Sequence, residues 1–129
     1  MIRFFALLSF LVMTSVASAS DVMDYKPGLI QSLLKEGKTV FVDYKASWCT
    51  TCAAQERVIE RLRSENDVYD KALTFVAVDW DNYRDHEVTT SRNIPRRSTL
   101  LVLKGDQELG RIVAGTSTKE IKALLDKGL

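Results

Sequence analysis

Apolar runs and stretches with helical spacing alternate along this chain. Two nearly continuous apolar runs, Thr39–Lys45 and Ala72–Val78, predict strands that are covered on both faces. A third run, Ser98–Leu103, leads through a polar turn at residues 104–108 into Leu109–Ala114, and this succession predicts an antiparallel hairpin. Together these runs predict the strands of one central sheet.

Apolar residues recur at helical spacing before and after the first predicted strand. Pro27 is favoured in the first turn of a helix and Gly37 at its end, and the apolar positions between them are Leu29, Ile30, Leu33 and Leu34. A second helix is expected over residues 50–64. The positions on its core-facing side are Ala53, Val58, Ile59 and Leu62.

The second half of the chain continues the alternation. A short helix is expected over residues 81–90, capped by Asp81 or Asn82. Ser117 and Glu120 form a capping box that opens the last helix, whose buried stripe is Ile121, Leu124 and Leu125. The order of elements predicts one α/β domain with a central mixed sheet, a C-terminal hairpin and helices on both faces.

The N-terminal residues have a different pattern. Phe4–Val12 is almost wholly apolar, and small residues in Val16–Ala19 form a cleavage site of the A-x-A type. The apolar segment has about nine residues, whereas a membrane span needs about 20. We therefore expect a signal peptide at residues 1–19, with a retained anchor as the alternative, and an exported, periplasmic domain at residues 20–129. Residues 20–26 are polar and are expected to fray.

The charge balance is close to neutral. The whole chain has a formal net charge of +1, and without Arg3 the basic and acidic side chains are equal in number, 17 of each. A neutral balance gives no electrostatic reason to expect binding to nucleic acid or to an acidic membrane surface. The two cysteines of the chain instead make cysteine-containing proteins the expected partners.

The sequence holds only two cysteines, in the motif Trp48-Cys49-Thr50-Thr51-Cys52. This motif follows a predicted strand and opens a predicted helix, where two residues three apart lie within disulfide-bonding distance. A structural disulfide is the alternative, but such a short loop constrains the unfolded chain poorly. The spacing therefore favours a redox-active pair.

The position of this pair predicts a role for each residue. Cys49 lies at the helix N-terminus, where the positive end of the helix dipole stabilises a thiolate, so it is the expected nucleophile. Cys52, one turn deeper, is the expected resolving thiol. Trp48 is expected to cover one side of the site, unless it serves only in packing.

Asp43 is an unusual residue within an apolar strand. Burial without a partner raises the pKa of a carboxyl group and costs stability. If Asp43 points beneath the cysteine pair, it is placed to accept the proton of Cys52. The alternatives are that it faces solvent at the strand end, or that it pairs with Lys45.

Other chemistries have fewer of the residues they need. A zinc site requires about four ligands, and the sequence offers the two cysteines and His86, which is expected at the surface. Ala53 after Cys52 excludes attachment of a c-type haem. We expect no cofactor other than the Cys49–Cys52 disulfide.

From Val42 through the W-C-x-x-C motif to Thr99-Leu100-Leu101-Val102 and the final helix, the chain resembles thioredoxin-fold proteins. The resemblance covers residues 25–127. It implies a thioredoxin-like fold and thiol–disulfide exchange, with Cys49 attacking and Cys52 resolving, and it gives Asp43 the place of the buried acidic residue of thioredoxins.

The chain departs from the thioredoxin pattern at three places. Thr50-Thr51 replaces the dipeptide that tunes the redox potential in this family, and Arg57 stands where thioredoxins have a helix-kinking proline. In this helix the sequence is more similar to the periplasmic C-terminal domain of DsbD-type reductases. At the position of the cis-proline before the strand, the gapless alignment places Ser98, and the alternative is Pro95 followed by a short insertion.

In the family, this loop lies against the cysteines and pairs with the client backbone. The resemblance therefore makes four residues candidates for client contact: Arg96, Arg97, Ser98 and Thr99. The two arginines are expected to stabilise the thiolate or to select acidic clients, and the alternative is that they are solvated loop charges.

These observations predict an exported oxidoreductase, more a reductant than an oxidant. Its clients would be exported proteins such as apocytochromes or sulfur-carrying proteins, with a membrane or periplasmic electron donor, and the protein would be a monomer. The alternative is a chaperone that binds copper or another soft metal through the two thiolates, because loss of the cis-proline would leave the cysteines open to metal.

Overall fold

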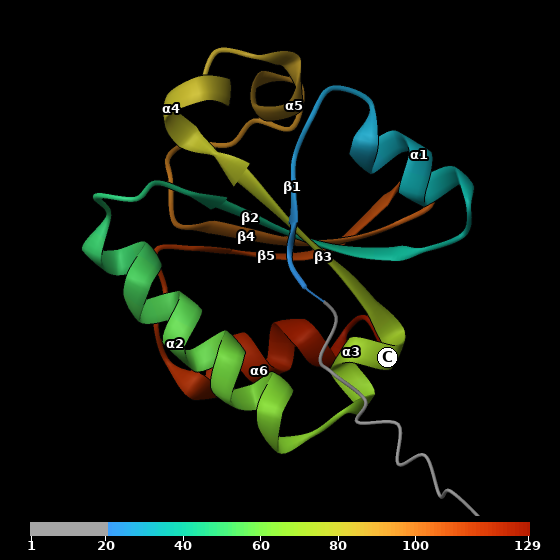
Figure 1. Cartoon of the computed structure of the whole chain (residues 1–129), viewed down its shortest axis with the longest axis vertical. Helices are drawn as coiled ribbons and strands as arrows, with labels where there is room; N and C mark the ends of the chain where they lie inside the picture. The colour runs from blue at the N-terminus through green and yellow to red at the C-terminus, as the bar shows by residue number, and fades with distance from the viewer. Residues whose placement is uncertain (1–20) are drawn as a thin grey trace, which may run out of the picture.

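The computed structural model describes residues 21–129. The predicted signal peptide lies outside the described residues. A five-stranded mixed sheet forms the centre of the molecule, in the order β1-β3-β2-β4-β5 (Figure 1). The strands are β1 (Met23–Asp24), β2 (Thr39–Lys45), β3 (Leu73–Asp79), β4 (Thr99–Lys104) and β5 (Gln107–Val113).

Six helices accompany these strands within the described part of the chain. They are α1 (Leu29–Lys35), α2 (Thr50–Glu65), α3 (Val68–Ala72), α4 (Trp80–Tyr83), α5 (Glu87–Thr90) and α6 (Thr118–Asp126). No helix among residues 21–129 is long and apolar enough to cross a membrane. The predicted α/β architecture, with its mixed sheet, C-terminal hairpin and final helix, is confirmed.

The pairing of the strands places β2 at the centre of the sheet. It runs parallel to β3 and antiparallel to β4, and all but its last residue are buried. β1 extends the parallel side and β5 the antiparallel side. Because both faces of β2 are covered, its sequence is apolar almost throughout rather than alternating.

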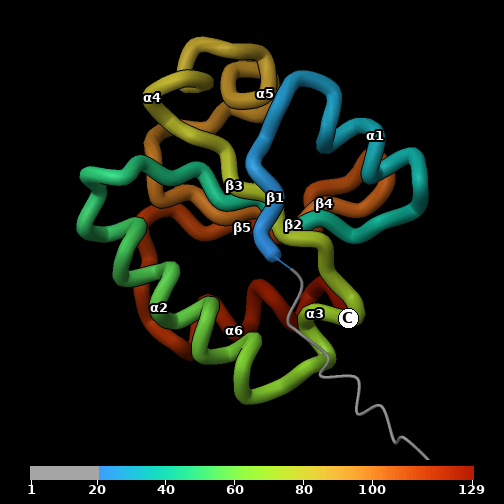
Figure 2. Tube along the Cα trace, in the orientation of Figure 1, coloured from blue at the N-terminus to red at the C-terminus, as the bar shows by residue number. Residues whose placement is uncertain are grey.

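The core has two layers, one on each face of the sheet. α1 and α5 pack on one face around Val40, Val42 and Tyr44 of β2, with α4 beside them. α2, α3 and α6 pack on the other face around Phe41. Figure 1 shows these two groups of helices on opposite sides of the sheet, and Figure 2 shows the C-terminus beside α3.

Strand alternation determines which residues reach α2. Successive side chains of a strand point to opposite faces, so Asp43 shares the face of Phe41 and lies under α2. Its neighbours across the sheet are Ala77 on β3 and Leu100 on β4. Since Ala77 is small, this register leaves space beside the carboxylate.

Some local predictions were wrong. Residues 23 and 24 do not fray but form β1, and the Tyr25 N–H donates to the Ala77 carbonyl at 2.8 Å. The expected helix over residues 81–90 is instead two short helices, α4 and α5, with Asp79 and His86 at their N-caps. The predicted cap of the last helix is confirmed, because Ser117 Oγ accepts from the Glu120 N–H.

Candidate functional site

The cysteine pair lies where β2 ends and α2 begins. Cys49 is the N-cap residue of α2, with extended backbone, and Cys52 lies in the first turn. The two residues form a disulfide, with their Cα atoms 5.2 Å apart. Both are buried, with exposures of 4% for Cys49 and 2% for Cys52, so Cys49 is barely more accessible than its partner.

The backbone around Cys49 favours negative charge on its sulfur. The Cys52 N–H donates to Cys49 Sγ at 3.1 Å. In an ordinary capped helix, the backbone N–H at this position donates to the side-chain oxygen of the N-cap residue. The positive end of the helix dipole adds to this hydrogen bond. Both effects stabilise a Cys49 thiolate once the disulfide is reduced, and neither acts on Cys52 in the same way.

The loop before β4 brings Ser98 against both sulfurs. Ser98 Oγ lies 3.2 Å from Cys49 Sγ and 3.1 Å from Cys52 Sγ, and the residue has no exposed surface. Its backbone is left-handed, with φ of 64°, and the described residues contain no cis peptide bond. Ser98 therefore takes the place that the gapless alignment gave it, with a trans peptide, while exposed Pro95 lies outside the contact.

Sequence reasoning missed Gln55, which holds this loop. Gln55 is fully buried in α2, and its Nε2 donates to the carbonyls of Ser98 and Gly115, both at 2.9 Å. The buried positions of α2 are Cys52, Gln55, Ile59 and Leu62, while the predicted Ala53 and Val58 are only half-buried. A polar residue at core spacing after Cys52 was the available signal.

Trp48 forms the rim of the site. Its side chain is 56% exposed, and its Nε1–H donates to both carboxylate oxygens of Asp81, at 3.1 and 2.9 Å. The guanidinium carbon of Arg97 lies 4.6 Å from the centre of the Trp48 ring system, within range of a cation–π contact. These contacts fix the indole between Asp81 and Arg97.

The other two loop candidates bond mainly within the loop. Arg96 donates to the carbonyl of Arg97 at 3.1 Å, and Thr99 Oγ1 donates to the carbonyl of Arg96 at 2.7 Å. Thr99 is fully buried, so its side chain shapes the loop and offers no surface to a client in this state. Arg96 and Arg97 keep partial exposure.

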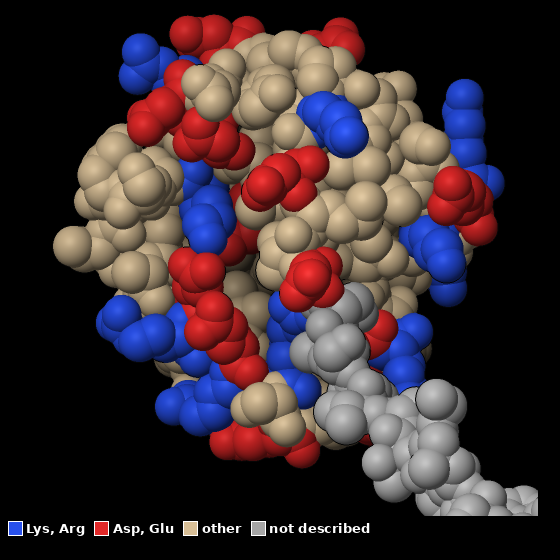
Figure 3. Space-filling view, viewed as in Figure 1, with Lys and Arg blue, Asp and Glu red and all other residues tan. Residues whose placement is uncertain are grey.

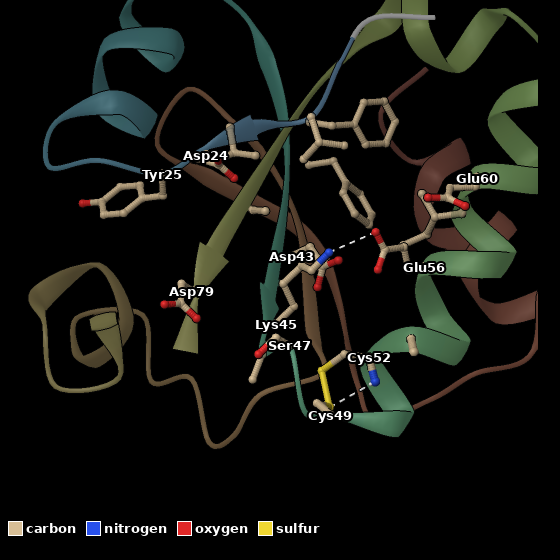
Figure 4. A pocket seen from close by; sticks show the side chains of 18 of the residues that line it. Asp24, Tyr25, Asp43, Lys45, Ser47, Cys49, Cys52, Glu56, Glu60 and Asp79 are labelled. Atoms are coloured by element: carbon tan, nitrogen blue, oxygen red, sulfur yellow. Dashed lines mark hydrogen bonds and ion pairs between the residues drawn. A yellow bond between two sulfur atoms is a disulfide. The ribbon is translucent and has the colours of Figure 1, made fainter. Parts of the chain in front are cut away.

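A cavity of about 680 Å³ runs from the disulfide along the inner side of α2, and Asp43 lines it together with Cys49 and Cys52. Figure 4 shows Asp43 between β2 and α2, on the cavity side of the pair. Its carboxylate is buried, and Oδ1 has no hydrogen-bond partner. Burial raises the pKa of Asp43 from 3.8 to about 7, against the lowering effect of Lys45 and with a further raising effect of Glu56. Asp43 does not face solvent.

Lys45 does not take Asp43 as its ion-pair partner. Its Nζ lies 3.0 Å from Glu56 Oε1, the pair drawn as a dashed line in Figure 4. The acidic side chains that line the cavity are Asp24, Asp43, Glu56, Glu60 and Asp79, and the basic ones are Lys45 and Arg63. In Figure 3, acidic side chains border the hollow between β1 and α2.

His86 lies apart from this chemistry. It caps α5, where its Nδ1 accepts from the Val88 N–H at 3.1 Å. Within residues 21–129, no three His, Cys, Asp or Glu side chains gather as a metal-binding group would require.

The comparisons with known proteins agree with this geometry. The family model described as Thioredoxin matches residues 25–127. Thioredoxin H4-2 of Oryza sativa subsp. japonica is 28% identical over 100 residues, which cover 75% of this chain and 71% of that protein.

Two solved structures extend the likeness to three dimensions. Trxlp from Edwardsiella tarda EIB202 has a TM-score of 0.69 at 25% identity, covering 81% of this chain and 98% of its own. The reduced thioredoxin pre-protein of Schistosoma mansoni has a TM-score of 0.66 at 26% identity, covering 85% and 100%. The chain belongs to the thioredoxin family.

Proposed function

We propose that this protein is an exported thiol–disulfide oxidoreductase that reduces disulfides in client proteins through Cys49 and Cys52. The family and the cysteine pair make it a protein thiol–disulfide oxidoreductase. The observation that carries the proposed roles is the N-cap geometry, in which only Cys49 Sγ receives the Cys52 N–H and the helix terminus.

The proposed reaction has two exchange steps. The Cys49 thiolate attacks one sulfur of a client disulfide, which forms a mixed disulfide and releases the other client sulfur as a thiolate. Cys52 then attacks Cys49 Sγ, which forms the Cys49–Cys52 bond and releases the second client thiolate. Two electrons pass from the dithiol to the client.

Asp43 is the proposed acceptor of the Cys52 proton in the second step. It lines the same cavity as Cys52, and its pKa of about 7 allows it to exchange a proton near neutral pH. The cavity is lined partly by polar side chains and is large enough to hold water, so the proton can travel through a bridging molecule. The partly exposed Arg96 and Arg97, and exposed Trp48 beside them, are the proposed client-contacting surface.

The sequence supports the finer parts of this proposal. The leader pattern of residues 1–19 supports export to the periplasm. The similarity of the α2 sequence to DsbD-type domains supports a reductant with a membrane or periplasmic electron donor. Apocytochromes and sulfur-carrying proteins are the proposed client classes.

Two variants and one potential test the function. Cys49→Ser is expected to abolish reduction of a protein disulfide such as that of insulin, and Cys52→Ser is expected to accumulate the mixed disulfide. Equilibration with glutathione gives the reduction potential of the pair. A potential of about −270 mV would indicate a thioredoxin-like reductant, and one of about −120 mV would indicate an oxidant. Client reduction by Cys49→Ser would contradict the assignment.

One observation favours a second candidate, the soft-metal chaperone. A serine hydroxyl, and not a proline ring, lies against the two sulfurs. Copper(I) bound in equimolar amount by the reduced protein, together with failure to reduce insulin, would favour this function over exchange.

A further inference from the structure

Ser98 makes contacts with the disulfide and with β2 that a proline at the same position could not make. Its hydroxyl contacts both sulfurs at near-equal distance, 3.2 Å to Cys49 and 3.1 Å to Cys52, and no solvent reaches it. A proline has no hydroxyl to place here, and it has no N–H. The Ser98 N–H donates to the Tyr44 carbonyl at 2.7 Å.

The residue is held in place from several directions. Its carbonyl accepts from the Ala114 N–H at 2.9 Å and from Gln55 Nε2 at 2.9 Å. With the bond to Tyr44, these contacts tie the loop to β2, to α2 and to the end of β5. The left-handed backbone at φ of 64° is unfavourable for serine, and the surrounding bonds maintain it.

A hydroxyl group can serve two different sulfurs at once. It has one O–H donor and two acceptor lone pairs. In the reduced protein, the helix terminus and the Cys52 N–H already favour charge on Cys49. The arrangement that satisfies every group is O–H donation to the Cys49 thiolate and acceptance of the Cys52 S–H by the same oxygen.

We propose that Ser98 is a catalytic residue of the exchange reaction, whose hydroxyl stabilises the Cys49 thiolate and keeps the proton on Cys52 until the mixed disulfide forms. This inference rests on the proposed function and extends it. A hydrogen bond to a charged acceptor is stronger than one to a neutral acceptor, so the hydroxyl favours the thiolate over the disulfide sulfur. Ser98 thereby makes the pair a weaker reductant than the same pair without the hydroxyl.

Two substitutions of Ser98 separate the hydroxyl from the backbone. Ser98→Gly removes the hydroxyl and also relieves the left-handed conformation, whereas Ser98→Ala removes the hydroxyl and keeps the Cβ. Asn93→Gly is the matched control, because Asn93 is also left-handed, at φ of 54°, but exposed and away from the sulfurs. If Ser98→Ala does not fold, Ser98→Gly still carries the test.

The first measurement is the pKa of Cys49 in the reduced protein, from the rate of iodoacetamide alkylation against pH, with the modified cysteine identified by mass spectrometry. Both Ser98 variants are expected to raise this pKa by about one unit, a tenfold increase in the affinity of the Cys49 thiolate for a proton. The potential is expected to become more negative by up to about 30 mV, the equivalent of a tenfold change in equilibrium constant. Asn93→Gly is expected to change neither.

An unchanged Cys49 pKa in Ser98→Gly would overturn the inference, as would an equal shift in Asn93→Gly. Because alkylation needs no client, this result is independent of the proposed function. The failure of that function would appear instead as client reduction by Cys49→Ser.

Discussion

Asp43, the proposed proton acceptor, is a residue that reduces the stability of the folded protein. Its carboxylate is buried beside the cavity, and Oδ1 has no partner. An apolar residue or an amide at this position would avoid the cost of burying a charge. The residue therefore makes the stability of the folded protein depend on pH.

The sign of this dependence follows from the pKa of Asp43, which is about 7 in the folded state against an ordinary value of 3.8. Between these values the folded protein holds a proton that the unfolded chain has released, so the free energy of unfolding falls as pH rises and is level above about pH 7. At about 1.36 kcal/mol per pKa unit, the total loss is about 4 kcal/mol.

We expect Asp43→Asn to remove this loss. The oxidised variant should gain stability over the unsubstituted protein as pH rises from 4 to 8, measured by urea unfolding at several pH values. Asp106→Asn, in the exposed hairpin turn, is the control and should show no such trend. A stability difference that is the same at every pH would mean that the Asp43 carboxyl is not the titrating group.

At the scale of elements, α2 positions the site from two sides. Its N-cap holds Cys49, and Gln55, one turn beyond Cys52, reaches the carbonyls of Ser98 and Gly115. The loop that faces the disulfide is therefore fixed by the same helix that carries the disulfide. A change in Gln55 should alter the site without touching either cysteine.

We expect Gln55→Leu to lower the free energy of unfolding by about 1 kcal/mol, because the half-buried Gly115 carbonyl loses its Gln55 donor and the buried Ser98 carbonyl keeps only the Ala114 N–H. It should also slow reduction of a client disulfide, since the Ser98 loop loses an anchor. Gln31→Leu, at an exposed position of α1, is the matched control. Chemical denaturation and insulin reduction measure the two effects, and equal effects of the two variants would contradict this role.

The sequence allowed prediction of the elements with strong patterns. β2 and β3 are long buried apolar strands, and the cap at Ser117 is a local signal, so each was found to within about two residues. β1 has two residues and α3 has five, too short for a period to be visible. Their existence depends on tertiary contacts, such as the bond from the Tyr25 N–H to Ala77.

The site was predictable in the same uneven way. Cys49, Cys52 and Asp43 stand out in sequence because their residue types are unusual where they occur. Only the core spacing of Gln55 after Cys52 marks it in the sequence, and its role does not show there because its partners come from loops distant in the chain. The contact of Ser98 with both sulfurs depends on a left-handed backbone, which nothing in the residue type requires.

At the scale of the whole molecule, stability is expected to fall from the centre of the sheet to its parallel edge. β2 is bonded on both sides and buried, whereas both residues of β1 are exposed and pair with β3 alone. Local opening is easiest where few buried contacts must break. The cavity beside Asp43 lies toward this weaker edge, because Asp24 and Tyr25 line it.

Amide hydrogen exchange should follow this order. We expect the slowest exchange in β2 and its neighbours β3 and β4, and much faster exchange in β1, measured on the oxidised protein by mass spectrometry or NMR. The Tyr25 N–H, bonded to Ala77, is the amide to compare with those of β2. Equally slow exchange at Tyr25 would show that the edge opens only with the whole fold.

The placement of the two tryptophans gives the protein a built-in optical signal. Trp80 packs against the cluster of Ala46, Cys49 and Cys52, and Trp48 precedes Cys49 directly. Since a disulfide quenches the emission of an indole that it contacts, Trp80 should be dim in the oxidised protein and brighter in the reduced protein. Because the chain has no other tryptophan, each turnover can be followed by fluorescence without any label.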